Sequence, residues 1–267
     1  MSEPLLTIGW SVLAERAAAI RLPERRPDVE VLVVVQGDPA AAEVPGRDDV
    51  RVVHLDSTGV ARSRNEVLRQ ARGTFVLFAD DDIVFREDAV RAMLEDLRRD
   101  DTLALGLGAA VDETGTTRKR YPRRSVRLHR WNSGKAATYE MMLRRDAFAR
   151  AGVSFDEDFG AGVPQYLGDE YILIADAVRA GLHCRFFPHV LAVHPVTSSG
   201  SGFGTRRDAA ARAAAFDRVF GRGAPVARLA FVLRRPQRFG SLGLAATDFQ
   251  TPDLVVQLGR PPHRIAF

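Results

Sequence analysis

The chain has 267 residues, of which 46% are hydrophobic and 27% charged, and its formal net charge is +4. This composition excludes collagen-like, coiled-coil and wholly disordered proteins, and the length suits one large domain or two small ones. The single cysteine, Cys184, excludes a disulfide framework and a cysteine-rich zinc module, and it favours a reducing, cytoplasmic location. No apolar run approaches the roughly 20 residues that span a bilayer, so we expect no transmembrane helix. The N-terminus does not resemble a signal peptide, and the positive charge favours an anionic partner.

Strand and helix patterns alternate through the first 112 residues. Apolar runs predict strands over residues 5–12, 31–35, 50–55, 75–79 and 103–111, and helices are expected over 14–22, 59–72 and 87–99. In the last of these helices, Val90, Met93, Leu94 and Leu97 share one face. The alternation predicts an α/β domain with a mainly parallel central sheet.

The middle of the chain begins with a basic segment, residues 118–130, in which lysines and arginines gather without an acid. We expect a loop or short hairpin there. The segment could hold a phosphate, approach an anionic membrane, or simply face water, and the last is favoured because charge runs are usually solvated. Further strands are predicted over 139–144, 185–187 and 191–193, helical segments over 146–151, 171–178 and 206–220, and a flexible Ser/Gly run over 197–204.

Three consecutive carboxylates, Asp80, Asp81 and Asp82, follow the strand predicted over 75–79. Open α/β sheets bind ligands outside the carboxyl ends of their strands. A divalent cation such as Mg²⁺ or Mn²⁺ best relieves the repulsion among adjacent carboxylates, and Asp80 and Asp82 can point to one side of an extended chain. The alternative is that these acids cap the helix that begins near Glu87. We favour metal or ligand binding.

Several segments together resemble a known family. Gly59 to Asn65, then Gly73, then Phe78 to Asp82 resemble the nucleotide-sugar domain of inverting family 2 glycosyltransferases with the GT-A fold. Phe155 to Gly162 and Gly168 to Glu170 resemble the acceptor-side segment, and His194-Pro195 resembles the distal histidine of that family. The resemblance runs in family order from about residue 5 to 200. It implies a Rossmann-like nucleotide-diphospho-sugar transferase domain over 1–204, with a donor half to about 112 and an acceptor half from 113, and a short C-terminal helical extension over 205–267.

The resemblance also implies residue roles. Asp82 is the expected metal ligand, with His194 and Asp80 as further ligands, and Asp80 also faces the ribose or donor sugar. The catalytic base is Glu170 or Asp169, because the family has Glu then Asp where this chain has Asp then Glu; we prefer Glu170 slightly. An acid pair favoured at a helix N-terminus is the alternative for both, and an exposed Arg62–Glu66 pair is the alternative for Arg62. The expected donor-binding residues are Ser11, Arg16, Gln36, Asp38, Arg62, Arg64, Asn65, Asp80 and Asp81, and Trp131 and Tyr166 are the acceptor candidates.

These residues predict a metal-dependent inverting glycosyltransferase. It would transfer one sugar from a nucleoside-diphosphate sugar, preferably a UDP-sugar, to a saccharide, lipid-linked or small natural-product acceptor. In the family, an acidic residue after the second strand helps to recognise the nucleotide base. Here that residue is replaced by Gln36 or displaced to Asp38, so the sequence does not identify the base of the donor nucleotide. Two alternatives are a sugar-phosphate nucleotidyltransferase and a non-catalytic basic nucleic-acid-binding protein. Residues 8–11 match a triphosphate loop poorly, and the arginines lack the interleaved aromatics of a base-stacking surface, so no nucleic-acid partner is expected.

Overall fold

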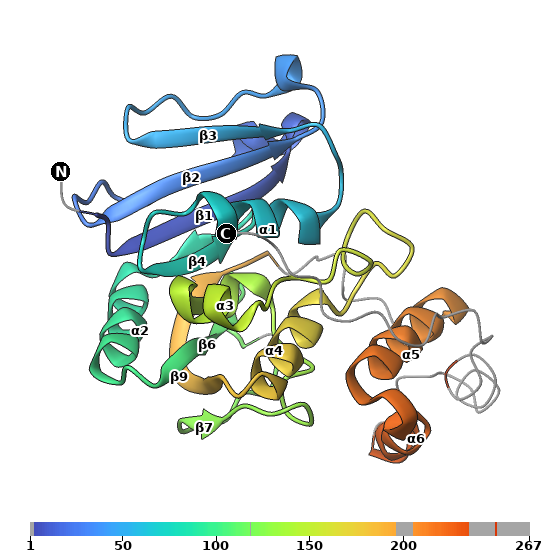
Figure 1. Ribbon diagram of the computed structural model, residues 1–267. Helices are drawn as coiled ribbons and strands as arrows, with labels where there is room; N and C mark the ends of the chain where they lie inside the picture. Colours follow the sequence, from blue (N-terminus) through green and yellow to red (C-terminus); the bar gives the residue numbers. More distant parts are fainter. Residues whose placement is uncertain (1–2, 118, 196–204, 235–248, 250–267) are drawn as a thin grey trace.

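A computed structural model of the protein describes residues 3–117, 119–195, 205–234 and 249 (Figure 1). Arg118, the predicted Ser/Gly run from Thr197 to Gly204, and the tail beyond Arg234 apart from Phe249 lie outside the described residues.

A mixed central sheet organises the part of the chain that is described, with nine strands in the order β3-β2-β1-β4-β8-β6-β9-β5 and β7 paired to β9. The first four strands in this order are parallel, as are β6 and β9, while β8 runs antiparallel between β4 and β6. The predicted α/β fold is thereby confirmed. The strands are β1 (Leu6–Leu13), β2 (Val29–Gln36), β3 (Val50–Leu55), β4 (Phe75–Ala79), β5 (Val84–Phe85), β6 (Leu103–Val111), β7 (Val126–Arg127), β8 (Met141–Arg144) and β9 (His183–Val193).

Helices cover both faces of this sheet (Figure 1). The helix α2 (Glu87–Arg99) packs Met93 and Leu97 on one face together with Trp10 of β1. The helices α1 (Val60–Gln70), α3 (Arg145–Ala151) and α4 (Asp169–Arg179) cover the other face, where Cys184 is also buried. Burial raises the pKa of this thiol to about 12, as expected for a cysteine that only packs.

Three predicted elements differ from the structure. The two short strands expected over 185–187 and 191–193 are one strand, β9, because the chain between Phe186 and Val190 bulges out while the ladder to β6 continues. The helix expected over 14–22 is a 3₁₀ turn, η1 (Ala14–Ala19). The strand expected from residue 139 begins at Met141, after a second 3₁₀ turn, η3 (Thr138–Glu140), whose Glu140 is buried and held by Lys119 and Tyr121.

The C-terminal helix α5 (Arg206–Phe220) lies beside α4, and α6 (Ala224–Arg234), which follows the turn η5 (Gly221–Gly223), packs against α5 (Figure 1). Apolar side chains of α4 and α5 share one small core, which contains Ile172 and Val219. Arg218 of α5 also donates hydrogen bonds of 2.7 Å to Asp156 and to Asp176, both buried. Since two buried carboxylates depend on this arginine, α5 is joined to the sheet domain by charge as well as by packing.

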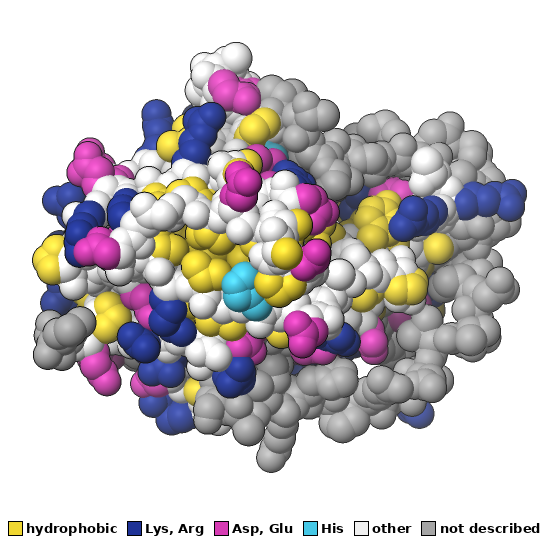
Figure 2. All heavy atoms as spheres, turned by 90° about the horizontal axis from the view of Figure 1, so that it is seen from above, with side chains coloured by type: hydrophobic (Ala, Val, Ile, Leu, Met, Phe, Trp, Pro, Cys, Tyr) yellow, Lys and Arg dark blue, Asp and Glu magenta, His cyan; other side chains and the backbone are white. Residues whose placement is uncertain are grey.

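Charged side chains of both signs are interspersed with hydrophobic ones on the face seen from the β3 side (Figure 2). This face therefore lacks the one-sign basic stripe that a nucleic-acid-binding surface needs. Within the described residues, no helix combines the length and the apolar character that crossing a membrane requires.

Candidate active site

The carboxyl ends of the parallel strands β1 to β4 meet at one edge of the sheet, and the three aspartates follow β4 there. The extended chain stops at Ala79, and Asp81 and Asp82 lie in a turn. Each aspartate faces a different partner. Asp80 lies 3.4 Å from Arg64 of α1, Asp81 2.5 Å from Arg16 of η1, and Asp82 3.5 Å from His194 beyond β9.

The helix-capping interpretation of the three aspartates is wrong. The N-cap of α2 is Arg86, which makes no side-chain cap bond, and the acids of the first turn are Glu87 and Asp88. The aspartates after β4 thus contact α1, η1 and the segment after β9, and they do not cap α2.

Arg62 is exposed, as its alternative interpretation expected, but the expected pairing with Glu66 is wrong. Its Nε donates to Glu157 at 3.1 Å, whereas Glu66 accepts from Arg69. Arg62 therefore faces the loop after α3 instead of its own helix.

Arg64 is the hub of the site. Its side chain is only 6% exposed, and its guanidinium donates to Asp169, to Glu170 at 3.2 Å and to Asp80 at 3.4 Å. Burial alone would lower the pKa of Arg64, but these three carboxylates hold it above its ordinary value. One buried cation thus joins the aspartate cluster to the acid pair that begins α4.

The acid pair lies at the first turn of α4, directly after Gly168, whose φ of +100° favours glycine. Glu170 accepts a hydrogen bond of 2.7 Å from the Thr138 hydroxyl, and its side chain is 20% exposed, against 5% for Asp169. Burial and the neighbouring Glu170 raise the pKa of Asp169 to about 8. Burial would also raise the pKa of Glu170, but Arg64 and the Thr138 hydroxyl bring it below its ordinary value. The more accessible acid is therefore also the one that stays ionised.

Asn65 holds the loop that follows α3. Its amide donates to the carbonyl of Phe155 at 3.0 Å and accepts from the N–H of the same residue at 2.9 Å, and it also donates to Glu157 at 3.2 Å. Asn65, expected to bind donor, is thus engaged with backbone. Gly160 of this loop packs so closely that a Cβ there would lie 2.7 Å from Val60.

His194 is buried beside Tyr139, with ring centroids 4.9 Å apart. Its Nδ1 lies 2.7 Å from the Pro195 carbonyl, which directs Nε2 toward Asp82. A backbone carbonyl on one imidazole nitrogen is the usual support for a metal-binding histidine. In the described part of the chain, no group of three or more His, Cys, Asp or Glu side chains is placed to hold a metal ion. Asp82 and His194 place one carboxylate and one imidazole nitrogen, both of them types of metal ligand, 3.5 Å apart.

The ends of β1 and β2 carry the expected nucleotide-side residues. Ser11 and Gln36 point to the face of the sheet that α1 covers, because Gln36 is in register with Leu13, two residues after Ser11. Gln36 is 3% exposed, and its Oε1 and the Ser11 Oγ are buried without a hydrogen-bond partner among the described residues. Such orphan atoms need a partner that a ligand can supply. Asp38 instead caps the turn η2 (Pro39–Ala41) by accepting from the N–H of Ala40.

The two acceptor candidates face α5. Trp131 is 57% exposed, with its ring centroid 4.5 Å from that of Phe220. The Tyr166 hydroxyl lies 3.4 Å from Asp208, and the Arg207 guanidinium lies 4.8 Å from the Tyr166 ring centroid.

Sequence reasoning did not find Thr138 and Tyr139, which contact Glu170 and His194. Both precede β8, and Thr138 meets an acid 32 residues away. No local pattern marks such a contact.

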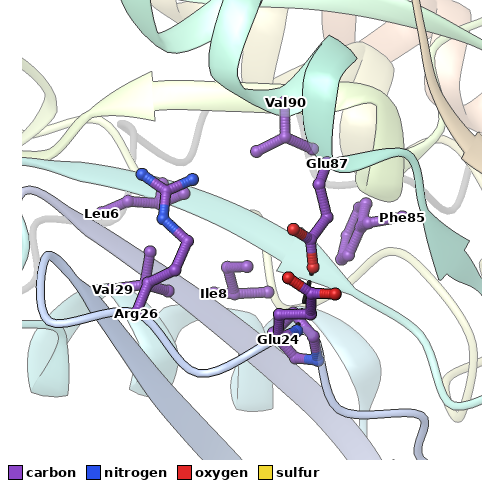
Figure 3. Close-up of a pocket in the computed structure, with 9 residues that line it drawn as sticks. Leu6, Ile8, Glu24, Arg26, Val29, Phe85, Glu87 and Val90 are labelled. Atoms are coloured by element: carbon purple, nitrogen blue, oxygen red, sulfur yellow. Dashed lines mark hydrogen bonds between the residues drawn. The ribbon is translucent and has the colours of Figure 1, made fainter.

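A small pocket lies away from this site, toward the amino end of β1 (Figure 3). Leu6, Ile8 and Val90 form its apolar wall, and Glu87 accepts a hydrogen bond of 2.9 Å from the Glu24 N–H across its mouth. None of the three aspartates is among the residues that line this pocket.

Residues 10–153, more than half of the chain, match the sequence family described as Glycosyl transferase family 2. The chain belongs to this family. The family that the resemblance predicted is thereby confirmed, and the match favours it over the two alternative functions. The matched segment contains the aspartate cluster and Arg64 but ends before the acid pair and His194.

One curated relative of this chain is the uncharacterized glycosyltransferase EpsJ of Bacillus subtilis (strain 168), with 24% identity over 152 residues. The match covers 49% of this chain and 44% of EpsJ, so the chain spans less than half the length of that relative.

Solved structures share the fold. S. aureus TarS residues 1–349 in complex with UDP-GlcNAc aligns with a TM-score of 0.61 and 13% identity, over 90% of this chain and 74% of that one. The mannosyltransferase PcManGT from Pyrobaculum calidifontis, in complex with GDP-Man and Mn²⁺, aligns with a TM-score of 0.54 and 18% identity, over 93% of this chain and 74% of that one. The predicted GT-A fold is confirmed.

Proposed function

We propose that this family 2 glycosyltransferase is metal-dependent and inverting, and that it moves one sugar from a nucleoside-diphosphate sugar to an acceptor hydroxyl. The observation that carries the proposal is the position of Arg64, which contacts Asp80 after β4 and the acid pair of α4 at once. A group-transfer enzyme needs its donor and acceptor groups held in a fixed relation. A buried cation shared by both sets of carboxylates provides it.

Glu170 is the proposed catalytic base. Its carboxylate takes the proton of the acceptor hydroxyl while the hydroxyl oxygen attacks the anomeric carbon, and the bond from that carbon to the diphosphate oxygen breaks. The exposure of Glu170, four times that of Asp169, supports this order of the pair. Asp169 is then a positioning residue that orients Arg64.

The proposed ligands of a Mn²⁺ or Mg²⁺ ion are Asp82 and His194, with Asp80 directed at the ribose or donor sugar. Such an ion, when bound, neutralises the charge that develops on the departing diphosphate. Asp81 and Arg16 form an ion pair beside these proposed metal ligands. The Arg16 side chain is exposed enough to approach the diphosphate of the donor.

The donor base is proposed to lie against Ser11 and Gln36, whose orphan oxygens can accept from a nucleobase N–H. A UDP-sugar is the preferred donor, supported by the UDP-GlcNAc in the TarS complex; PcManGT, with GDP-Man, shows that the fold also accommodates another base. Trp131 and Tyr166 are the proposed acceptor-side residues, and the acceptor is a saccharide, lipid-linked or small natural-product hydroxyl. The division into donor half, acceptor half and extension is part of the same proposal, as is a cytoplasmic location.

A thermal-shift panel tests the donor and metal together. UDP, GDP, dTDP and CDP are added with and without Mn²⁺ to the wild type and to Asp82→Ala. A ligand at a hundred times its dissociation constant adds about 2.7 kcal/mol to stability, so one nucleotide should raise the melting temperature of the wild type only with Mn²⁺. Asp82→Ala should lose this response.

The matched control is Asp96→Ala. Asp96 also pairs with a histidine, His189, at 2.7 Å, and its side chain is 29% exposed against 32% for Asp82. This variant should respond like the wild type. Equal responses of Asp82→Ala and Asp96→Ala would contradict the metal proposal.

A further inference from the structure

The outer face of α6 carries an apolar stripe, defined here as Val226, Leu229 and Leu233. These side chains are 70%, 52% and 73% exposed, and their spacing of three and four residues places them on one helix face. The opposite face is anchored, because Arg228 is buried and its guanidinium lies 2.7 Å from Asp217. Because Arg228 fixes the opposite face of α6 to α5, the stripe faces away from the protein core.

Positive charge gathers in the basic segment, whose Arg130 reaches the Phe220 ring at the end of α5. In the basic segment, Arg123, Arg124, Arg127 and Arg130 are exposed, and none forms an ion pair with a residue that the structure describes. Lone exposed arginines are usually balanced by nearby acids on a soluble surface. Here the charge is left for an external partner.

The stripe and the basic segment adjoin through Phe220, the last residue of α5. The Trp131 ring centroid lies 4.5 Å from the Phe220 ring centroid, and the Arg130 guanidinium lies 5.2 Å from it. Only the turn η5 separates Phe220 from α6, and β7 of the basic segment and α6 lie along the same lower edge of the molecule in Figure 1. We define the docking surface as the stripe together with Trp131, Phe220 and the exposed arginines of the basic segment, which Arg130 joins to the end of α5.

We propose that this surface docks on a membrane that contains anionic phospholipid. Apolar side chains of an amphipathic helix enter the boundary between headgroups and acyl chains, tryptophan favours the same depth, and arginines are drawn to anionic headgroups. A second copy of the chain fits less well. In a two-fold dimer the same patch lies on both sides, so the arginine cluster would tend to face itself.

Docking would bring the acid pair close to the bilayer. The Tyr171 hydroxyl donates to the Arg130 carbonyl at 2.6 Å, and Tyr171 directly follows Glu170 in α4. If the proposed function holds, membrane docking implies that the acceptor hydroxyl belongs to a lipid-linked molecule, and this implication rests on the proposed function. The docking itself does not.

Vesicle sedimentation of the full chain tests the proposal. The vesicles are phosphatidylcholine alone, or equal parts of phosphatidylcholine and phosphatidylglycerol. The wild type should sediment with the anionic vesicles only, and less at high salt. One arginine near an anionic surface contributes about a fivefold factor, so R123Q/R124Q should bind at least about tenfold more weakly, and L229S/L233S should also lose most binding.

The matched controls are R98Q/R99Q on α2 and V52S on β3, which are exposed and lie away from this surface. They should sediment like the wild type, and all variants should keep the wild-type melting temperature. Equal binding of R123Q/R124Q and the wild type overturns the proposal. Failure of the wild type to bind any vesicles also overturns the proposal. If the wild type instead forms dimers, and L229S/L233S abolishes them, the stripe is an interface between copies of the chain. A retained thermal shift with nucleoside diphosphate in that case leaves the proposed function intact.

Discussion

The guanidinium of Arg64 donates a hydrogen bond to the carboxylate of Asp169, 105 residues further along the chain, and both side chains are almost fully buried. Removing one member of a buried ion pair strands the other charge in a medium that solvates it poorly. The stability and the chemistry of this site therefore depend on the same contact.

At pH 9, where Asp169 with its pKa of about 8 is ionised, replacing Arg64 by methionine should cost about 3 kcal/mol of unfolding free energy, because Asp169 loses its counter-ion while still buried. Urea unfolding measures this. The double variant Arg64→Met/Asp169→Asn should recover part of the loss, since the stranded charge is then gone. Strictly additive losses would show that the pair is not coupled.

Glu170→Gln should lower kcat by about 10²-fold to 10⁴-fold, the range typical of a lost general base, and leave the nucleotide-induced thermal shift unchanged. Asp169→Asn should reduce kcat less, because it acts through Arg64. The measurement is the initial rate of nucleoside-diphosphate release. A larger loss in Asp169→Asn would exchange the two roles.

The pKa of Asp169 also predicts a pH dependence of stability. An acid whose pKa is raised on folding holds its proton more strongly in the folded protein, so the unfolding free energy falls as pH rises from 3.8 to about 8. One proton limits this slope to about 1.4 kcal/mol per pH unit. Wild type and Asp169→Asn are compared by urea unfolding across this window, and the wild type should lose more stability toward pH 8. Parallel curves would mean that Asp169 is ionised throughout.

Gln36→Met should bind nucleoside diphosphate at least about tenfold more weakly, because one hydrogen bond to the base is lost. The same variant should be more stable without ligand by about 1 kcal/mol, because it removes a buried acceptor that has no partner. Calorimetric titration and urea unfolding give the two values. A variant that is more stable and binds normally would separate Gln36 from the nucleotide.

His194→Gln should weaken the Mn²⁺-dependent part of nucleotide binding and spare whatever binding persists in a chelator. His189→Gln is the control, since His189 also faces a carboxylate. Loss of binding in both metal-containing and metal-free buffer would assign His194 a packing role against Tyr139 instead.

Periodic elements were predictable from the sequence. The residue ranges of β4, α2, β6 and α5 agree with the predicted ones, because a buried strand or a one-sided helix imposes its period on the residues that pack. The bulge in β9 was not predictable, because the interruption around Pro188 marks an end of a strand and a bulge equally well.

Candidate residues of the site were predictable from the sequence, but their contact partners were not. Three carboxylates at a strand end indicate ligand binding from their charge alone. That Asp80, Asp81 and Asp82 face Arg64, Arg16 and His194 depends on how α1, η1 and β9 meet in space. The bonds from Asn65 to Phe155 and from Thr138 to Glu170 depend on the same tertiary arrangement.

The two salt bridges of Arg218 decide how far the chain can be shortened. A version ending before residue 205 would lose α5 and leave the carboxylates of Asp156 and Asp176 without this cation, beside an uncovered Ile172. Uncompensated charge and exposed apolar surface both promote aggregation and local unfolding. The smallest cooperative folding unit therefore includes α5, and a trimmed protein for crystallisation or expression should end after this helix.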